Sequence, residues 1–112
     1  MPTRYTVVLP HPRQARGADD AFSFRGQSPA TFADQLATAL RETAWFERWR
    51  NAQADPKTIE PTLAGADPQA QVFARLDEPR INIEIHTTLS SKVICHRLAL
   101  LAGRHWELHD VR

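Results

Sequence analysis

What the chain lacks sets the first limits on its class. It has one cysteine, Cys95, among 112 residues, which excludes an internal disulfide framework and favours a reducing compartment. No apolar run approaches the ~18 residues of a membrane span. The apolar segment 5–9 ends at Pro10 and is too short for a secretion signal. These absences predict a cytoplasmic protein that has no membrane partner.

Strong net charge is also missing. The formal net charge is +1, which gives no electrostatic footprint for nucleic acid and argues against that partner. The chain holds twelve arginines but two lysines. Arginine suits bidentate and stacked contacts, although a GC-rich bacterial genome produces the same bias. The length and the ordinary globular composition predict a single domain over residues 1–112.

The first half of the chain predicts two strands and one helix. Residues 4–9 are rich in valine, and residues 21–25 alternate Phe22 and Phe24 with polar neighbours, so both segments are predicted as strands. Ser28 can cap a helix whose first position is Pro29. Since no glycine or proline follows, the helix is predicted to reach about residue 50. Residues 51–69 are proline-rich and predict a long connection with one short turn near 58–63.

The last forty residues predict four strands, at 71–76, 80–89, 92–101 and 105–111. Ile81, Ile83 and Ile85 alternate with polar residues, which indicates a sheet with one apolar face. Residues 93–101 also fit a helix, because leucine is common there. The strand is preferred since Trp106 follows one glycine-containing turn later, as in a hairpin. In the preceding hairpin, formed by strands 80–89 and 92–101, Glu84 and Arg97 form a cross-strand pair.

Together these elements predict an α+β fold. One long amphipathic helix packs across an antiparallel sheet that is built from an N-terminal strand pair and a C-terminal four-strand meander. A helix followed by such a meander resembles cystatin-like and NTF2-like domains. The resemblance concerns the fold and carries no function.

Two tryptophans in the helix are the main candidates for a binding site. At 100° per residue, Trp45 and Trp49 lie off the arc that contains the helix's other apolar residues. Two interpretations stay open. Either the 51–69 connection or the N-terminal hairpin buries the rings, or the rings form an exposed partner-binding patch of the kind that dominates interfaces. The members of that patch would be Trp45, Trp49, Arg41, Arg48 and Arg50.

The sequence gives little support for metal binding or catalysis. His86, Cys95 and His109 are Zn ligand types on the predicted polar sheet face. They lack the close paired spacing of zinc motifs, so no metal or cofactor is predicted. No catalytic motif is present, and a cysteine in mid-strand is expected to act as a small packing residue.

The sequence therefore predicts a small non-catalytic interaction domain. Its partner would be another protein or a second copy, bound at the tryptophan end of the helix or at a free sheet edge. Two alternatives stay open. One is a nucleic-acid-binding module that uses aromatic and arginine patches such as Phe22, Phe24 and Arg25. The other is a small-molecule- or metal-binding domain with its pocket between helix and sheet.

Overall fold

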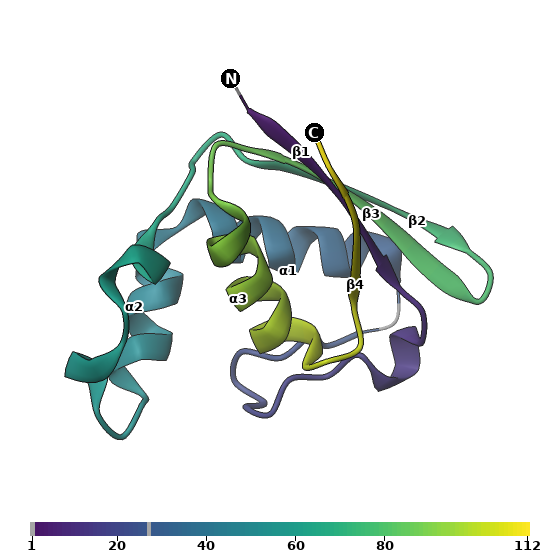
Figure 1. Ribbon diagram of the computed structural model, residues 1–112. Helices are drawn as coiled ribbons and strands as arrows, with labels where there is room; N and C mark the ends of the chain where they lie inside the picture. Colours follow the sequence, from purple (N-terminus) through teal and green to yellow (C-terminus); the bar gives the residue numbers. More distant parts are fainter. Residues whose placement is uncertain (1, 27) are drawn as a thin grey trace.

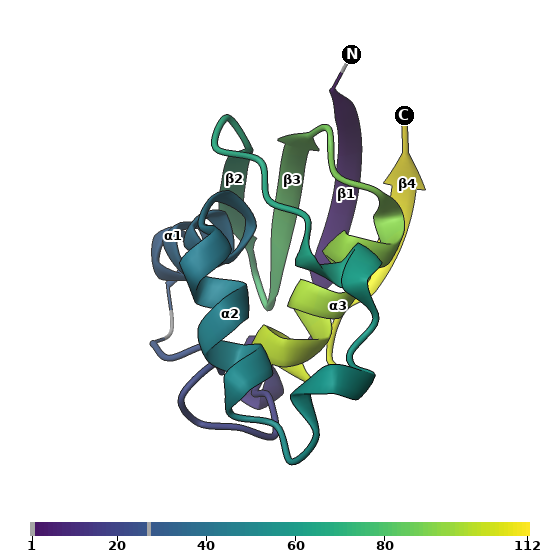
Figure 2. The same cartoon turned by 90° about the vertical axis from the view of Figure 1, so that its left-hand side faces the viewer.

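The computed structural model describes residues 2–26 and 28–112, which form three α-helices on one face of a four-stranded antiparallel sheet (Figures 1 and 2). The mixed α+β class and the antiparallel sheet are confirmed. In chain order the elements are β1 (Thr3–Leu9), α1 (Pro29–Arg41), α2 (Thr43–Asn51), β2 (Gln71–Asp77), β3 (Arg80–Thr87), α3 (Ser91–Ala102) and β4 (Glu107–Val111). Short 3-10 turns lie at Pro12–Gln14, Pro56–Thr58 and Pro61–Ala64.

The strand order is β2-β3-β1-β4, so β1 lies inside the sheet between β3 and β4. The predicted C-terminal meander is wrong, and a cystatin-like or NTF2-like outline is not confirmed. With α1 and α2 counted together, the element order is β-α-β-β-α-β, the split-βαβ arrangement of ferredoxin-like domains. This likeness concerns topology and carries no function.

The face of the sheet that packs on the helices is built from alternate residues of the two central strands. Ile81, Ile83 and Ile85 lie opposite Leu9, Val7 and Tyr5 in the β1–β3 ladder, and all six side chains are buried. The predicted isoleucine alternation is confirmed, because one face of β3 must be apolar where the helices cover it. We call this the inner face and the opposite one the outer face.

The predicted strand at residues 21–25 is wrong, because this segment forms turns. Phe24 is nevertheless fully buried. Its ring packs edge-on against Phe32, with centroids 4.9 Å apart, and its backbone N–H donates to the carbonyl of Leu101 at 2.8 Å. Phe24 is thus buried against α1 and α3 without any strand partner.

The predicted single helix over residues 29–50 is wrong in one respect, since it breaks at Glu42. Its start is confirmed: Ser28 accepts a hydrogen bond from the N–H of Thr31 at 3.1 Å, and Pro29 is the first helical residue. Glu42 has extended backbone angles (φ −107°, ψ 118°) and separates α1 from α2. Neither glycine nor proline causes the break. It lets α2 turn out of line with α1 (Figure 1).

The predicted strand at residues 92–101 is wrong, because Ser91–Ala102 is helix α3. Val93, Ile94, Leu98 and Leu101 are buried, a spacing that fits one face of a helix. Gly103 follows with a φ of +64°, a conformation that favours glycine and ends the helix. The predicted Glu84–Arg97 pair is therefore also wrong. None of the described helices is long and apolar enough to cross a membrane.

Candidate functional site

Trp45 and Trp49 lie in the junction between α2 and α3, where they are 7% and 9% exposed. The Phe22 ring packs edge-on against Trp45, with centroids 5.5 Å apart. The Trp49 ring packs edge-on against the imidazole of His96, with ring centroids 4.7 Å apart. Of the two interpretations of these rings, the structure shows the buried one. Phe22, from the N-terminal segment, supplies part of the cover.

Arg97 is the centre of this junction, and its side chain is fully buried. Its guanidinium donates to the carbonyls of Leu63 (2.8 Å), Ala39 (3.3 Å) and Gly65 (3.3 Å). It also lies over the Phe46 ring at 4.5 Å. These bonds tie α3 to the end of α1 and to the proline-rich connection. Backbone carbonyls and an aromatic face thus surround the cation.

Arg97 influences the protonation of its neighbour His96. Arg97 Nη1 lies 2.9 Å from His96 Nδ1, so this nitrogen accepts from the guanidinium and carries no proton. Burial, and then the Arg97 charge, lowers the pKa of His96 to about 4. Burial lowers the pKa of Arg97 to about 10. At neutral pH the pair therefore holds one charge, on Arg97.

Of the other predicted patch residues, Arg48 lines a hollow together with Trp45, whereas Arg41 and Arg50 are bonded to other groups. Arg41 Nε donates to the carbonyl of Ala70 at 2.7 Å, just before β2. Arg50 forms an ion pair with Glu47. Arg48 is exposed and borders a hollow of about 630 Å³ beside Trp45 and Arg25. Arg41 and Arg50 thus have structural partners, which leaves Arg48 facing open space.

The three weak metal candidates are separated by the sheet. His86 on β3 and His109 on β4 bond to Glu84 (2.8 Å) and Glu107 (3.1 Å), while Cys95 lies on α3. The residues that the structure describes hold no group of three metal-binding side chains. Burial raises the pKa of the Cys95 thiol, which is the opposite of what an activated nucleophile requires.

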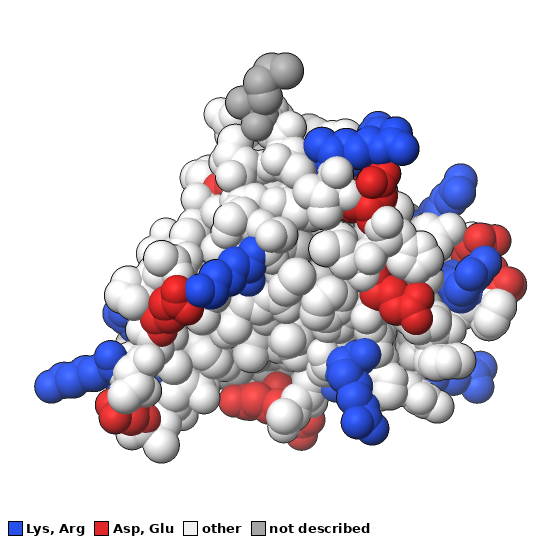
Figure 3. Space-filling view, viewed as in Figure 1, with Lys and Arg blue, Asp and Glu red and all other residues white. Residues whose placement is uncertain are grey.

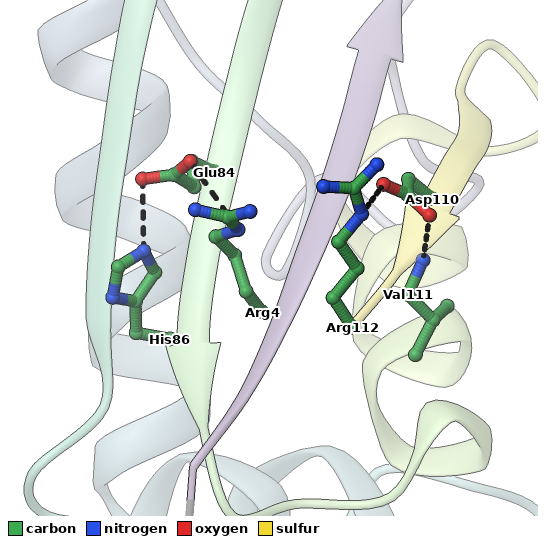
Figure 4. Close-up of polar contacts among 6 residues, drawn as sticks. All are labelled: Arg4, Glu84, His86, Asp110, Val111 and Arg112. Atoms are coloured by element: carbon green, nitrogen blue, oxygen red, sulfur yellow. Dashed lines mark hydrogen bonds and ion pairs between the residues drawn. The ribbon is translucent and has the colours of Figure 1, made fainter.

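The outer face of the sheet carries side chains of both signs. Figure 4 shows Arg4 beside Glu84 and, further along the sheet, Arg112 beside Asp110, with N···O distances of 3.8 and 2.6 Å. Figure 3 shows the same mixing of signs elsewhere on the surface. Exposed pairs of this kind each stabilise a fold by about 0–1 kcal/mol. A hollow of about 600 Å³ lies on this face between Thr6, Phe73 and His109.

Exposed apolar side chains gather at the sheet edges. Among the described residues, the large exposed ones are Phe73 (52%), Leu76 (52%) and Val111 (47%). Phe73 and Leu76 belong to edge strand β2, and Val111 to edge strand β4. We call residues 72–76 of β2 the edge surface. Sequence reasoning missed it, although the charged residues around 75–80 are typical of an edge strand.

Comparisons with known proteins do not assign the chain to a family. No protein-family model matches the chain, and the searches of curated proteins and of solved structures return no significant match.

Proposed function

We propose that this chain is a small non-catalytic protein-interaction domain, and that its edge surface on β2 contacts the partner. The observation that carries the proposal is the exposure of Phe73 and Leu76 on a strand with one unpaired side. An edge strand presents a row of free N–H and C=O groups, which another chain can pair with. A cytoplasmic location, which the single cysteine favours, belongs to the same proposal.

The other edge of the sheet is less suited to binding. The pairing of β4 with β1 shifts register between Thr6 and Val7, and such irregularities are one way in which proteins protect an edge. Glu107, Asp110 and the following Arg112 place charges along β4. Apolar exposure on β2 combined with regular pairing to β3 favours β2 as the binding edge.

Nucleic acid is a weaker alternative. Base stacking requires accessible aromatic rings, but Phe24 and Trp49, which lie next to arginines in the sequence, are buried. The net charge of +1 also gives little counterion release. Phe73 is the exposed aromatic that remains among the described residues, and one ring does not make a stacking platform.

Site-specific photo-crosslinking in the native cells tests the proposal. A photoreactive phenylalanine replaces Phe73 in one variant and exposed Arg104, outside the sheet, in a matched control. We expect a discrete adduct with one protein from position 73, its loss when Leu76→Asp is added, and no such adduct from position 104. Absence of adducts from position 73, or the same adducts from both positions, would contradict the proposal.

A further inference from the structure

Helix α1 lies beneath β2 rather than beneath the centre of the sheet. It makes its main sheet contacts with β2, and Figure 2 shows it at this edge. The Arg41–Ala70 hydrogen bond of 2.7 Å fixes the end of α1 at the start of β2. At 100° per residue, Ala30 and Ala37 lie within about 40° of Arg41 around the helix. Asp34 lies within about 20° of Arg41, so this flank of α1 carries Ala30, Asp34 and Ala37.

The inner-face residues of β2 stand above this flank. Val72, Ala74 and Leu76 pair with inner-face Ile85, Ile83 and Ile81. They are nevertheless only partly buried or, for Leu76, exposed. Ala30 below them is exposed as well. Ala37, further along α1, is 7% exposed and is therefore already covered. We call the surface that residues 72–76 form with Ala30 the edge trough.

We infer that the edge surface binds an extended segment of the partner protein as an added strand, whose alternate side chains pack on the edge trough. This inference rests on the proposed function. Side chains of a strand alternate between faces, so one row of the segment faces α1 and the other lies on the outer face. The exposed side chains of Leu76 and Ala30 suit contact with small or medium apolar residues such as valine.

The side chains of the bound segment that lie on the outer face should favour negative charge. Arg80 pairs with Asp77 at 3.8 Å, and Arg4 pairs with Glu84 at 3.8 Å. Within residues 2–26 and 28–112 the structure shows no ion pair for exposed Arg75. Opposite charges on neighbouring strands attract. An acidic residue is therefore the favoured neighbour of Arg75, and a β-branched residue the favoured neighbour of Phe73.

A second copy of this chain is a poorer occupant. Antiparallel pairing of two β2 strands about a two-fold axis sets them about 4.8 Å apart. Each copy carries α1 beneath that strand, and packed helices need about 8–10 Å between their axes. Two copies would therefore bring their α1 helices into collision below the joined edge, whereas a lone strand would not.

A synthetic heptapeptide with valine at alternate positions, acetyl-Lys-Val-Glu-Val-Thr-Val-Thr-amide, tests the inference by NMR on the labelled full chain. We expect amide shifts confined to residues 71–77 and 30–37. Replacing the peptide's glutamate by lysine should weaken binding about threefold to fivefold, a cross-strand charge effect. Arg75→Glu should reverse that preference. Ala30→Arg should block the trough, while Ala54→Arg in an exposed connection should not.

Two outcomes would overturn strand addition. One is the absence of shifts in β2 at millimolar peptide, and the other is binding that ignores both the charge swap and Ala30→Arg. Adducts from position 73 that persist in either case would leave the interaction function standing with a different binding mode. Loss of those adducts together with peptide binding would remove both.

Discussion

The α2–α3 junction and the β2 edge use similar residues in opposite ways. The junction combines Trp45, Trp49 and Arg97, and the edge combines Phe73 and Arg75. Arg97 is fully buried and bonded to three carbonyls, whereas Phe73 is half exposed on an edge strand that has one unpaired side. Aromatic and arginine residues are common both in cores and in interfaces. Their surroundings therefore separate a structural cluster from a surface that can bind.

The largest effect should follow from emptying the junction. Trp45→Ala removes a buried ring that packs against Phe22 and lies near Arg97. We expect the free energy of unfolding to fall by about 3–5 kcal/mol, since large-to-small core changes leave a cavity. Urea unfolding followed by circular dichroism measures the change. A loss below about 1 kcal/mol would show that the ring contributes little to the core.

Removing the buried charge should have the next largest effect. Arg97→Met keeps an apolar stem but leaves the carbonyls of Ala39, Leu63 and Gly65 without this donor. Unsatisfied buried acceptors cost about 1–3 kcal/mol, so we expect a loss of about 2–3 kcal/mol in urea unfolding. Exposed Arg104→Met is the matched control and should change stability by less than about 0.5 kcal/mol. Equal effects of the two variants would contradict the central role of Arg97.

Acid should lower the free energy of unfolding through His96. The pKa of His96 is lowered from 6.5 to about 4 in the folded protein, so between these values the unfolded chain binds more protons. Stability is then full above pH 6.5 and declines as the pH falls toward 4. Allowing for partial exposure of the ring, we expect a loss of about 1–2 kcal/mol.

Unfolding measured from pH 7 to pH 4 checks this dependence. His96→Gln keeps a side-chain acceptor and should flatten the profile, while the matched change at exposed His109 serves as the control. An unchanged slope in His96→Gln would show that the acid sensitivity arises elsewhere. Asp67 is one such source, because hydrogen bonds led by the Thr87 hydroxyl lower the pKa of its carboxyl.

The smallest effect on stability should come from the β2 edge. Phe73→Ser removes an aromatic that is 52% exposed, so we expect a change within about 0.5 kcal/mol. The same variant should lose most partner binding. Urea unfolding measures the change in stability, and the peptide titration measures the loss of binding. Both are performed on one preparation of the variant. A loss of stability comparable to that of Trp45→Ala would show that Phe73 belongs to the core. The difference between the junction and the β2 edge would then disappear.

Local patterns predicted part of this fold correctly. The alternation of Ile81, Ile83 and Ile85 and the Ser28-Pro29 helix start each depend on neighbours within a few residues. The strand prediction for segment 93–101 is wrong because the glycine-containing turn before Trp106 indicated a hairpin, while the buried positions of the segment follow a helical spacing. The position of β1 between β3 and β4 depends on pairing across the whole chain, which local periodicity does not encode.

The candidate site was harder to predict than the fold. The spacing of Trp45 and Trp49 on a continuous helix placed them off the core arc, but their burial depends on Phe22 and on α3. Both lie far away in the sequence. The sequence does not distinguish Phe73, because it is one apolar residue in a short strand. Its exposure follows from the strand order, which leaves β2 at the edge.

The extended residue Glu42 uncouples the rotational phases of α1 and α2. A continuous helix transmits every residue's 100° turn to its far end, so α1 would dictate where the Trp45 ring points. With one non-helical residue between them, each helix orients its apolar side independently, α1 toward the sheet and α2 toward α3. A residue inserted at this joint could be absorbed there, whereas one inserted within either helix would rotate its packed face away from its partner.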